Sequence, residues 1–278
     1  MSVFPQNNFD LDNPSLISVL DELPFWSAPF GIKLLEKIIP GKNKTVLDIG
    51  CGTGFPLVEL AMRFGDSCRI FGLDPWKAAL VRAQEKIIAF GVTNVELINS
   101  VAEDMPLPDH SLDLITSNNG LNNVSDLERS LSECARVLKP GGQLVFTMNL
   151  EGTMTEFYSV MESILERYHL GDAILKMRQH IYEKRKPLEE VLEMLQKHGF
   201  MLGSVDRDEF SYSFTDGSTM FRHFFIRIAF MEAWEKIIPA EQHLKIFAEI
   251  EDMINKLSND KGFYRVTVPF VVISAHQG

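Results

Sequence analysis

The sequence predicts an α/β fold built on a doubly wound, mostly parallel sheet. A short apolar run at residues 45–49 breaks into glycines at alternate positions and is followed by a helical pattern, which is how such a sheet begins. Segments typical of strands and helices then alternate through about residue 149, which indicates parallel strands covered on both faces. From about residue 150 several helical patterns follow one another, so a second, mainly helical part is expected.

Composition excludes several classes of protein. The 278 residues carry a net charge of −11, which argues against a general affinity for nucleic acid or for anionic membranes. No apolar run approaches the roughly 20 residues that cross a bilayer, and residues 1–12 lack the pattern of a signal peptide. The odd set of Cys51, Cys68 and Cys134 is typical of reduced thiols and predicts a cytoplasmic location.

Residues 1–41 are expected to form a leading segment and a first helix. Residues 1–28 look irregular because prolines interrupt them, and helical periodicity starts after Pro29. Trp26 and Phe30 make the end of this segment aromatic. Two interpretations stay open: simple packing onto the main domain, or a lid over a bound cofactor.

The alternating core is expected over residues 42–149. Its predicted strands are 45–49, 69–74, 95–98, 112–116 and 143–148, and its helices include 76–90 and 127–138. Beyond it, residues 150–199 read as helices at 155–169, 172–184 and 187–198, the last belonging to the core. Residues 200–278 read as strands at 200–214 and 265–275, with an insertion at about 215–262 that holds helices at 218–238 and 241–257.

The glycine turn at Gly50, Gly52 and Gly54 narrows the choice of nucleotide. A dinucleotide fold places its third glycine one position later, where this chain has Phe55. No basic residue of the turn is available for a phosphate, and Asp48 suits a cationic group. This pattern favours a nucleoside-like cation without phosphates, and S-adenosylmethionine (SAM) fits that description. A nicotinamide-dependent oxidoreductase that uses the same opening is the alternative.

Asp74 ends the second predicted strand, 20 residues after Gly54. A carboxylate at this edge of the sheet accepts both hydroxyls of a ribose, each bond contributing about 1.5–3 kcal/mol. The competing interpretation is a cap for the helix that starts near Pro75. Together with the glycine turn, the position favours ribose binding.

Five motifs in order resemble the class I, Rossmann-like SAM-dependent methyltransferases that modify small molecules. The resemblance covers about residues 42–149. The matching stretches are Leu47 to Gly54, Gly72 to Asp74, Ala102 to Pro106, Leu112 to Asn118 and Glu133 to Gly142. The resemblance implies SAM as cofactor and S-adenosylhomocysteine (SAH) as product. It also implies a seven-stranded sheet with an antiparallel terminal hairpin, and a helical cap from residues 150–185 and 215–262 that builds the acceptor pocket.

The same resemblance assigns the cofactor site. The expected cofactor-binding residues are Asp48, Gly50, Cys51, Gly52, Gly54, Asp74, Pro75, Trp76, Ala102, Glu103, Asp104, Asn118 and Trp26. Cys51 is expected to contribute as a small residue of the turn and not as a catalytic thiol, and Arg136 to be structural. The histidines show no metal-binding spacing, so no metal is predicted.

The expected reaction is in-line transfer of a methyl group from SAM to a small organic acceptor. A Ser-Asn-Asn-Gly run at 117–120 differs from the Pro-Pro-aromatic turn of enzymes that methylate DNA bases. The acceptor atom (O, N, S or C) is left open, and no catalytic residue is assigned. Tyr158, Tyr168, His169, His180 and Tyr182 are only candidates for acceptor contacts. A SAM-binding protein without transferase activity is a second alternative.

One apolar stripe in the insertion has helical spacing. It consists of Phe224, Phe225, Ile228, Met231 and Trp234. Such a stripe is most often core or a subunit contact, so a homodimer through the insertion helices is one expectation. A role in lining an apolar acceptor pocket is the alternative.

Overall fold

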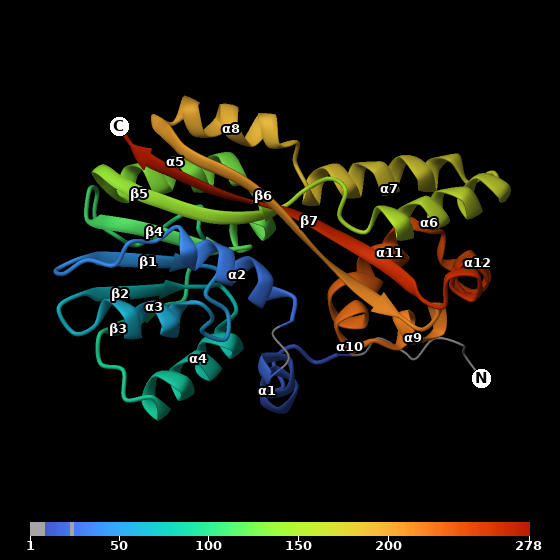
Figure 1. Cartoon of the computed structure of the whole chain (residues 1–278), viewed down its shortest axis with the longest axis horizontal. Helices are drawn as coiled ribbons and strands as arrows, with labels where there is room; N and C mark the ends of the chain where they lie inside the picture. Colours follow the sequence, from blue (N-terminus) through green and yellow to red (C-terminus); the bar gives the residue numbers. More distant parts are fainter. Residues whose placement is uncertain (1–8, 23–24) are drawn as a thin grey trace. The chain divides into compact units, whose positions relative to one another are not determined.

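A computed structural model describes residues 9–22 and 25–278 of the chain (Figure 1). The described residues form two units. The sheet unit comprises residues 11–149, 187–208 and 270–278, and the helical unit comprises residues 9–10, 150–186 and 209–269. The division falls within the last two strands, each of which contributes to both units.

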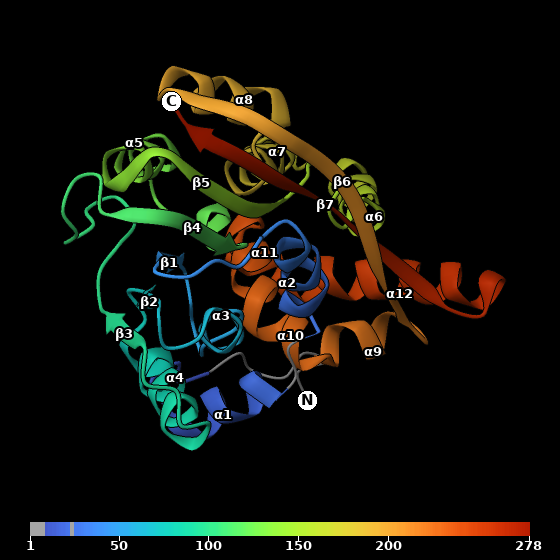
Figure 2. The ribbon, with the colours of Figure 1, turned by 60° about the vertical axis from the view of Figure 1, so that its left-hand side comes forward.

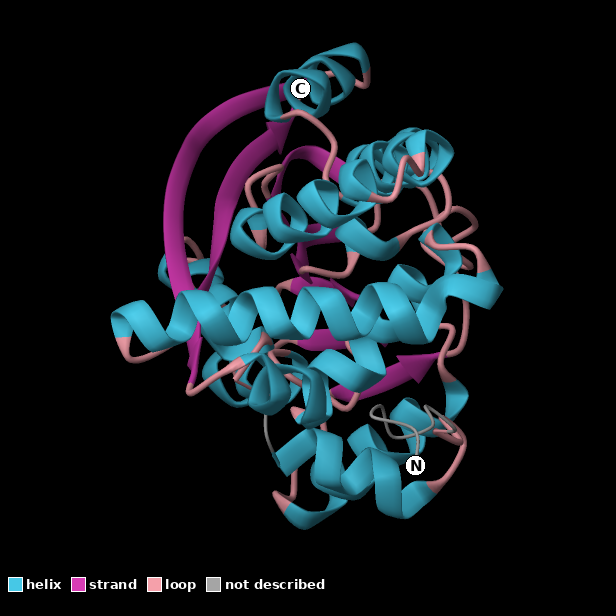
Figure 3. Ribbon diagram, turned by 90° about the vertical axis from the view of Figure 1, so that its right-hand side faces the viewer, coloured by secondary structure: helices cyan, strands magenta, loops and turns pink. Residues whose placement is uncertain are grey.

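One seven-stranded sheet runs in the order β3-β2-β1-β4-β5-β7-β6. The first five strands are parallel, and β7 pairs with β5 in the antiparallel sense. Two long strands, β6 and β7, lie side by side toward the C terminus (Figures 2 and 3). The strands are β1 (Thr45–Ile49), β2 (Arg69–Leu73), β3 (Val95–Ile98), β4 (Leu112–Asn118), β5 (Leu138–Asn149), β6 (Phe200–Phe214) and β7 (Tyr264–Gln277). The predicted sheet with its antiparallel end is confirmed.

The order of the strands reverses between β1 and β4. After β1 the chain builds outward through β2 and β3, then returns to place β4 on the other side of β1. Because crossovers between parallel strands are right-handed, the helices that follow β1 and β2 cover one face and the helix that follows β4 covers the other. In such sheets ligands bind at the carboxyl ends of the strands beside the point of reversal, and we call this place the crevice.

Helices pack on the sheet through apolar stripes. In α3, Leu57, Leu60 and Ala61 are almost fully buried, and in α5 Leu131 and Cys134 are inaccessible to solvent. Strand β1 is buried from Val46 to Ile49, as expected for a central strand covered on both faces. The helices of the sheet unit are α1 (Pro14–Glu22), α2 (Ser27–Glu36), α3 (Leu57–Phe64), α4 (Lys77–Ala89), α5 (Leu127–Val137) and α8 (Leu188–Lys197), with a 3₁₀ turn at Leu121–Asn123.

The helical unit is held by an aromatic core. Trp234 is fully buried, stacks on Phe157 with ring centroids 3.9 Å apart, and also stacks on Phe230. Its helices are α6 (Thr155–Arg167), α7 (Gly171–Lys184), α9 (Gly217–Arg222), α10 (Phe224–Ile226), α11 (Glu232–Ile237) and α12 (His243–Lys261), with a π turn at Arg227–Met231 and a 3₁₀ turn at Ala240–Gln242. No helix of the described residues is long and apolar enough to cross a membrane.

Three local predictions were wrong. Residues 14–22 are helical, because Asn13 accepts the amide of Ser15 at 2.9 Å and thereby caps a helix in which Pro14 takes a first-turn position. The predicted helix 218–238 is interrupted at His223, whose backbone is extended, and again by the π turn. Strand β5 begins five residues earlier than predicted, at Leu138, and accommodates the extra residues by a shift in register against β4.

Candidate functional site

A glycine turn leaves the carboxyl end of β1 at the point where the strand order reverses. Gly50, Gly52 and Gly54 all have positive φ angles, of 71°, 52° and 103°. Only glycine adopts such angles without strain, which explains the alternate spacing in the sequence. The turn is fixed at its start, because the amides of Gly50 and Cys51 both donate to the carbonyl of Leu73 at the end of β2.

The first and second glycines differ in their surroundings. A Cβ on Gly50 would lie 2.6 Å from the Cα of Gly120, in the loop after β4, so the two backbones pack directly on each other. A Cβ on Gly52 would meet nothing within 4 Å. Gly50 therefore serves the packing of two loops, whereas Gly52 borders open space that a ligand can approach.

Asp74 joins the turn to the next strand. One carboxylate oxygen accepts the amide of Gly52 at 2.8 Å and the other accepts the amide of Trp76 at 2.7 Å. The capping interpretation is wrong, because α4 begins at Lys77 with Trp76 as its N-cap and without a side-chain cap, so the bond to the Trp76 amide fixes only the turn before the helix. The contact with Gly52 brings the acid to the glycine turn. Burial raises the pKa of Asp74, while the two amide bonds lower it. Each oxygen keeps a lone pair for a further donor.

Asp48 is a buried carboxylate below the turn. It has no solvent exposure, and its Oδ1 accepts the hydroxyl of Thr116 at 2.7 Å. Oδ2 has no hydrogen-bond partner among the described residues, although the amide of Leu57 lies close enough to lower the pKa. Desolvation dominates and, with a smaller effect of Asp74, raises the pKa of Asp48 to about 7. A cation placed near this carboxylate would stabilise its ionised form.

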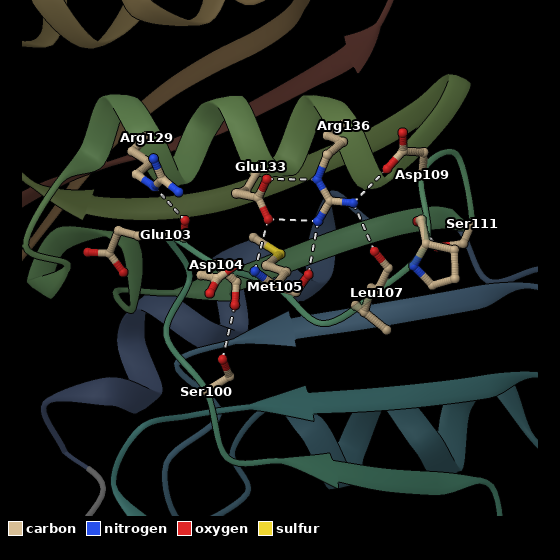
Figure 4. Close-up of polar contacts among 11 residues, drawn as sticks. Ser100, Glu103, Asp104, Met105, Leu107, Asp109, Ser111, Arg129, Glu133 and Arg136 are labelled. Atoms are coloured by element: carbon tan, nitrogen blue, oxygen red, sulfur yellow. Dashed lines mark hydrogen bonds and ion pairs between the residues drawn. The ribbon is translucent and has the colours of Figure 1, made fainter.

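The loop after β3 is held by an arginine at the end of α5 (Figure 4). Arg136 donates to the carbonyls of Met105 and Leu107 and forms ion pairs with Glu133 and Asp109, each at 2.7 Å. The predicted structural role of Arg136 is confirmed. The contacts fix the path of the chain beside the site.

The two acids of this loop have different surroundings. The carboxylate of Glu103 accepts the amides of Ser125 and Asp126, so it is committed to the start of α5. The carboxylate of Asp104 is exposed and accepts no hydrogen bond from the described residues. Ala102 is buried. Of the predicted residues here, Asp104 is the acid available to a ligand.

Asn118 ends β4 and is tied to the leading helix. Its amide donates to the carbonyl of Ser27 at 3.0 Å, which places the start of α2 at the end of β4. Trp26 precedes this helix and contacts Phe30 with ring centroids 5.9 Å apart. The structure thus brings Trp26 and Asn118 to one side of the crevice.

Helix α1 is fastened to the opposite side, beside α4 (Figure 2). Asp21 accepts the hydroxyl of Thr53 in the glycine turn at 2.8 Å and forms ion pairs with Arg82 and Lys86 of α4. Near the other end, the indole of Trp76 donates to the carbonyl of Leu11 at 3.0 Å. The leading segment is therefore bonded both to the turn and to the residue that follows Asp74 and Pro75.

Cys51 lies in the turn with only 1% exposure. Burial, with the nearby charges of Asp48 and Asp74, raises the pKa of its thiol well above the ordinary value. A thiol that stays protonated is a poor nucleophile. This agrees with the expectation that Cys51 contributes as a small residue.

Three positions that the sequence did not single out also shape the site. Thr116 bonds Asp48, and Asp21 bonds Thr53. Asn99 donates to the carbonyls of Asp74 and Pro75 at 3.0 Å and so holds the acid in place. Asn99 directly follows β3, just as Asp74 directly follows β2. This position after a strand could have identified Asn99 as a site residue from the sequence.

The acceptor-contact candidates lie in the helical unit and do not form one cluster. Tyr158 accepts the indole N–H of Trp234, Tyr168 donates to Glu249, and Tyr182 lies under the ammonium of Lys186. Burial, followed by the charges of Arg185 and Lys184, lowers the pKa of His180 to about 4. His169 has a positive φ of 55° at the end of α6. None of these positions is marked as catalytic by its contacts.

A doubly wound sheet with a glycine turn and a carboxylate at its switch point defines a Rossmann-like, nucleotide-binding class of domain. Within that class, residues 47–146 match the family model described as the methyltransferase domain. These residues therefore form a methyltransferase domain.

Individual relatives agree with this family. A demethylmenaquinone methyltransferase from Bacillus licheniformis is 42% identical over 113 residues, which are 41% of this chain and 48% of the relative. The chain thus matches about half the length of such curated relatives. The YcgJ protein from Bacillus subtilis has a TM-score of 0.58 at 18% identity, covering 90% of this chain and 98% of that one. A SAM-dependent methyltransferase from Aquifex aeolicus has a TM-score of 0.53 at 20% identity, covering 94% and 98%. Both structures show the same fold.

Proposed function

We propose that this protein is an enzyme that transfers a methyl group from SAM to a small-molecule acceptor. The observation that carries the proposal is the bond between the Asp74 carboxylate and the Gly52 amide, because it joins a ribose-binding acid to an open glycine turn at the switch point. The family of residues 47–146 supports the same conclusion.

Different residues of the crevice are proposed to bind different parts of the cofactor. The free lone pairs of Asp74 accept the ribose hydroxyls, and Gly52 lets the nucleoside approach the backbone. Asp104 and the backbone at Ala102 and Glu103 lie where the adenine binds in the family. Asp48 provides negative charge for the cationic end of SAM, near Asn118 and Trp26. Pro75 and Trp76 complete the ribose side.

The leading segment is proposed to cover this site. Its two fastenings, Asp21 to Thr53 and Leu11 to Trp76, lie at the glycine turn and beside the ribose acid. A segment bonded at both places restricts the exchange of a bound nucleoside with solvent. This supports the lid interpretation for residues 9–22, whereas residues 1–8 and 23–24 of the predicted segment 1–41 lie outside the described residues.

Methyl transfer from SAM requires the protein to orient the acceptor more than to activate the methyl group. The sulfonium of SAM already makes the methyl group electrophilic, so the protein must hold the acceptor atom in line behind it and exclude water. Orientation of this kind contributes about 7–11 kcal/mol. We propose that residues 150–185 and 215–262 hold the acceptor. The relatives named demethylmenaquinone methyltransferase support a small organic acceptor.

A thermal-shift titration tests the proposal. SAH at 100 times its dissociation constant should stabilise the protein by about 2.7 kcal/mol, which raises the melting temperature by about 5–10 °C. The same titration with NADH tests the oxidoreductase alternative, which predicts binding of NADH and none of SAM. A protein that binds SAH but transfers no methyl group to any member of a metabolite panel would be a SAM-binding protein without transferase activity.

The cytoplasmic location and the homodimer stay predictions. Trp234 and Met231 of the apolar stripe are buried within one chain, which leaves fewer of its residues for a subunit contact. Sedimentation of the purified protein tests the homodimer directly.

A further inference from the structure

A cavity of about 810 Å³ lies in the helical unit between α7 and the segment 228–237. Its volume falls in the range of about 300–1,000 Å³ typical of small-molecule sites. One wall runs along α7 from Leu175 to Lys184, and the opposite wall contains Ile228, Ala233 and Ile237. We call this cavity the α7–α11 groove. Aliphatic side chains from both walls give it an apolar part.

The charges of the groove are unevenly compensated. Of its two acids, Glu232 forms an ion pair with Lys236 at 2.6 Å, and Glu183 accepts the side-chain amide of Gln179 at 2.8 Å. Its other two ammonium groups, on Lys176 and Lys184, have no carboxylate within 4.0 Å among the described residues. Because Glu183 also lacks an ion-pair partner among the described residues, the three lysines and two acids of the groove leave it one net positive charge, in a chain whose net charge is −11.

A third cation lies next in the chain. Arg185 is only 4% exposed, and its Nε and Nη1 have no hydrogen-bond partner among the described residues. Its guanidinium lies 5.5 Å from the centre of the Tyr158 ring, a contact that offsets part of the burial. Unlike a buried lysine or histidine, arginine does not lose its charge by deprotonation. Its positive charge is therefore fixed.

His180 lies between the groove and the residues that surround Arg185. It lines the groove, and its ring lies 6.5 Å from that of Tyr158. Because burial and the charges of Arg185 and Lys184 depress its pKa, it stays neutral near pH 7 and adds no charge of its own. The C-terminal end of α7 thus carries the positive charges of Lys184 and Arg185 beside the carboxylate of Glu183.

We propose that the α7–α11 groove binds an amphipathic anion, a small molecule with an apolar body and a carboxylate or phosphate group. Lys184 contacts the anionic group, and Arg185 adds a fixed positive charge at the same end of α7. Lys176 lies eight residues earlier, about 12 Å away along the helix axis, and adds positive charge along the groove wall. The aliphatic residues of both walls hold the apolar body. The inference goes beyond the proposed methyl transfer, because this binding requires no SAM.

Calorimetric titration of the full chain with octanoate tests the proposal, with 1-octanol and octylammonium as neutral and cationic probes of equal length. We expect octanoate to bind at least about tenfold more tightly than 1-octanol, and octylammonium to bind most weakly. Octyl phosphate distinguishes a preference for phosphate from one for carboxylate. Equal affinity for octanoate and 1-octanol would overturn the proposal.

Two variants and a control locate the site. Lys184→Gln should weaken octanoate binding several-fold, whereas Lys186→Gln should not, since Lys186 lies over the ring of Tyr182 and does not line the groove. Arg185→Met should weaken octanoate binding and leave the melting temperature of the ligand-free protein unchanged or higher, because it removes an unpaired buried charge. Equal effects of Lys184→Gln and Lys186→Gln on octanoate binding, or a lower melting temperature for Arg185→Met, would contradict the proposed anion site.

The octanoate titration contains no SAM, so its failure would not affect the proposed SAM site. Failure of the SAH titration would likewise not affect the proposed anion site.

Discussion

The carboxylate of Asp74 accepts the amide of Gly52 at 2.8 Å, so the ends of two neighbouring strands share one hydrogen bond at the mouth of the crevice. Replacement of this acid should weaken cofactor binding, and it also removes the acceptor of the Gly52 and Trp76 amides, so stability must be measured alongside affinity. Asp74→Ala removes up to two bonds to the ribose, each contributing about 1.5–3 kcal/mol. We therefore expect the dissociation constant of SAH to rise by about 100-fold or more, measured by calorimetry.

Asp113→Asn is the matched control for Asp74→Ala. Asp113 also belongs to the sheet unit, but it lies at the amino end of β4, where it pairs with Lys139 at 2.8 Å. The control should lower stability and leave the affinity for SAH unchanged. An Asp74→Ala protein that still binds SAH as tightly as the native protein would remove Asp74 from the site.

Asp48 should make both stability and cofactor binding depend on pH. Its pKa is about 7 in the folded protein and 3.8 when exposed, so between these values the folded state holds a proton that the unfolded state has lost. The free energy of unfolding therefore falls as the pH rises from about 4 to 7. Asp48→Asn keeps an oxygen for Thr116 and should stabilise the ligand-free protein at pH 8 by about 2–4 kcal/mol.

SAM binding should change in the opposite direction. A cationic ligand prefers the ionised carboxylate, so below pH 7 the affinity for SAM should fall by up to about tenfold per pH unit. Asp48→Asn should bind SAM weakly and with little pH dependence. Calorimetry between pH 6 and 8 measures both effects, and a native affinity that is flat across this range would contradict the assigned role.

Gly50 and Gly52 provide a pair of substitutions with different outcomes. Gly50→Ala forces a side chain to within 2.6 Å of Gly120 at a positive φ, so it should destabilise the protein by about 3 kcal/mol or more. Gly52→Ala meets no atom within 4 Å and should cost only about 1–2 kcal/mol of backbone strain. Its methyl group would fill the space proposed for the nucleoside, so SAH affinity should fall at least about tenfold.

Chemical denaturation and SAH titration of both glycine variants check this pair. Loss of stability without loss of affinity in Gly52→Ala would show that the open space beside Gly52 is not used by the cofactor.

The two acids after β3 should respond differently to removal. Glu103→Ala leaves the amides of Ser125 and Asp126 without their acceptor and should cost about 1–3 kcal/mol of stability. Asp104→Ala loses no side-chain hydrogen bond to the described residues, so its stability should change by less than about 0.5 kcal/mol. Because Asp104 is proposed to face the adenine, its loss should weaken SAH binding several-fold. An affinity that falls only in Glu103→Ala would reverse the assignment.

The contacts of helix α1 predict an effect on cofactor exchange. Thr53→Val removes the hydroxyl that donates to Asp21 and keeps the shape of the side chain. A net loss of about 1 kcal/mol should raise the dissociation rate of SAH by up to about fivefold. Stopped-flow fluorescence measures this rate, with Thr93→Val, on the surface hydroxyl bonded to Asp66, as the control. Equal rates in both variants would argue against a lid.

The parts of the site that are contiguous in sequence were predictable. The strand, glycine turn and helix start lie within residues 45–61, and Asp74 closes the next strand, so local patterns located the crevice. Contacts between distant segments were not predictable in the same way. Asp21 contacts Thr53 only because α1 packs beside α4. Helix α1 was not predicted, because the prolines of residues 1–28 indicated an irregular segment. The sequence predicted a structural role for Arg136 but not its partners. The carbonyls of Met105 and Leu107 belong to the backbone, so no residue type indicates that they accept from Arg136.

The structure of the helical unit was predicted least well from the sequence. Its stripe around Trp234 correctly indicated an apolar face, but the break at His223 and the π turn depend on tertiary packing that periodicity does not encode. The unpaired Arg185 carries no sequence signal either, since its significance lies in the absence of a nearby acid among the described residues.

The division of β6 and β7 between the two units has a genetic consequence. The helical unit has no continuous coding segment: residues 150–186 and 209–269 are separated by α8 and the first half of β6, which belong to the sheet unit. Recombination that exchanged only one of these pieces between related genes would join halves of two different helical cores. Residues 187–208 are the stretch that a laboratory chimera must retain while both flanking pieces are replaced together.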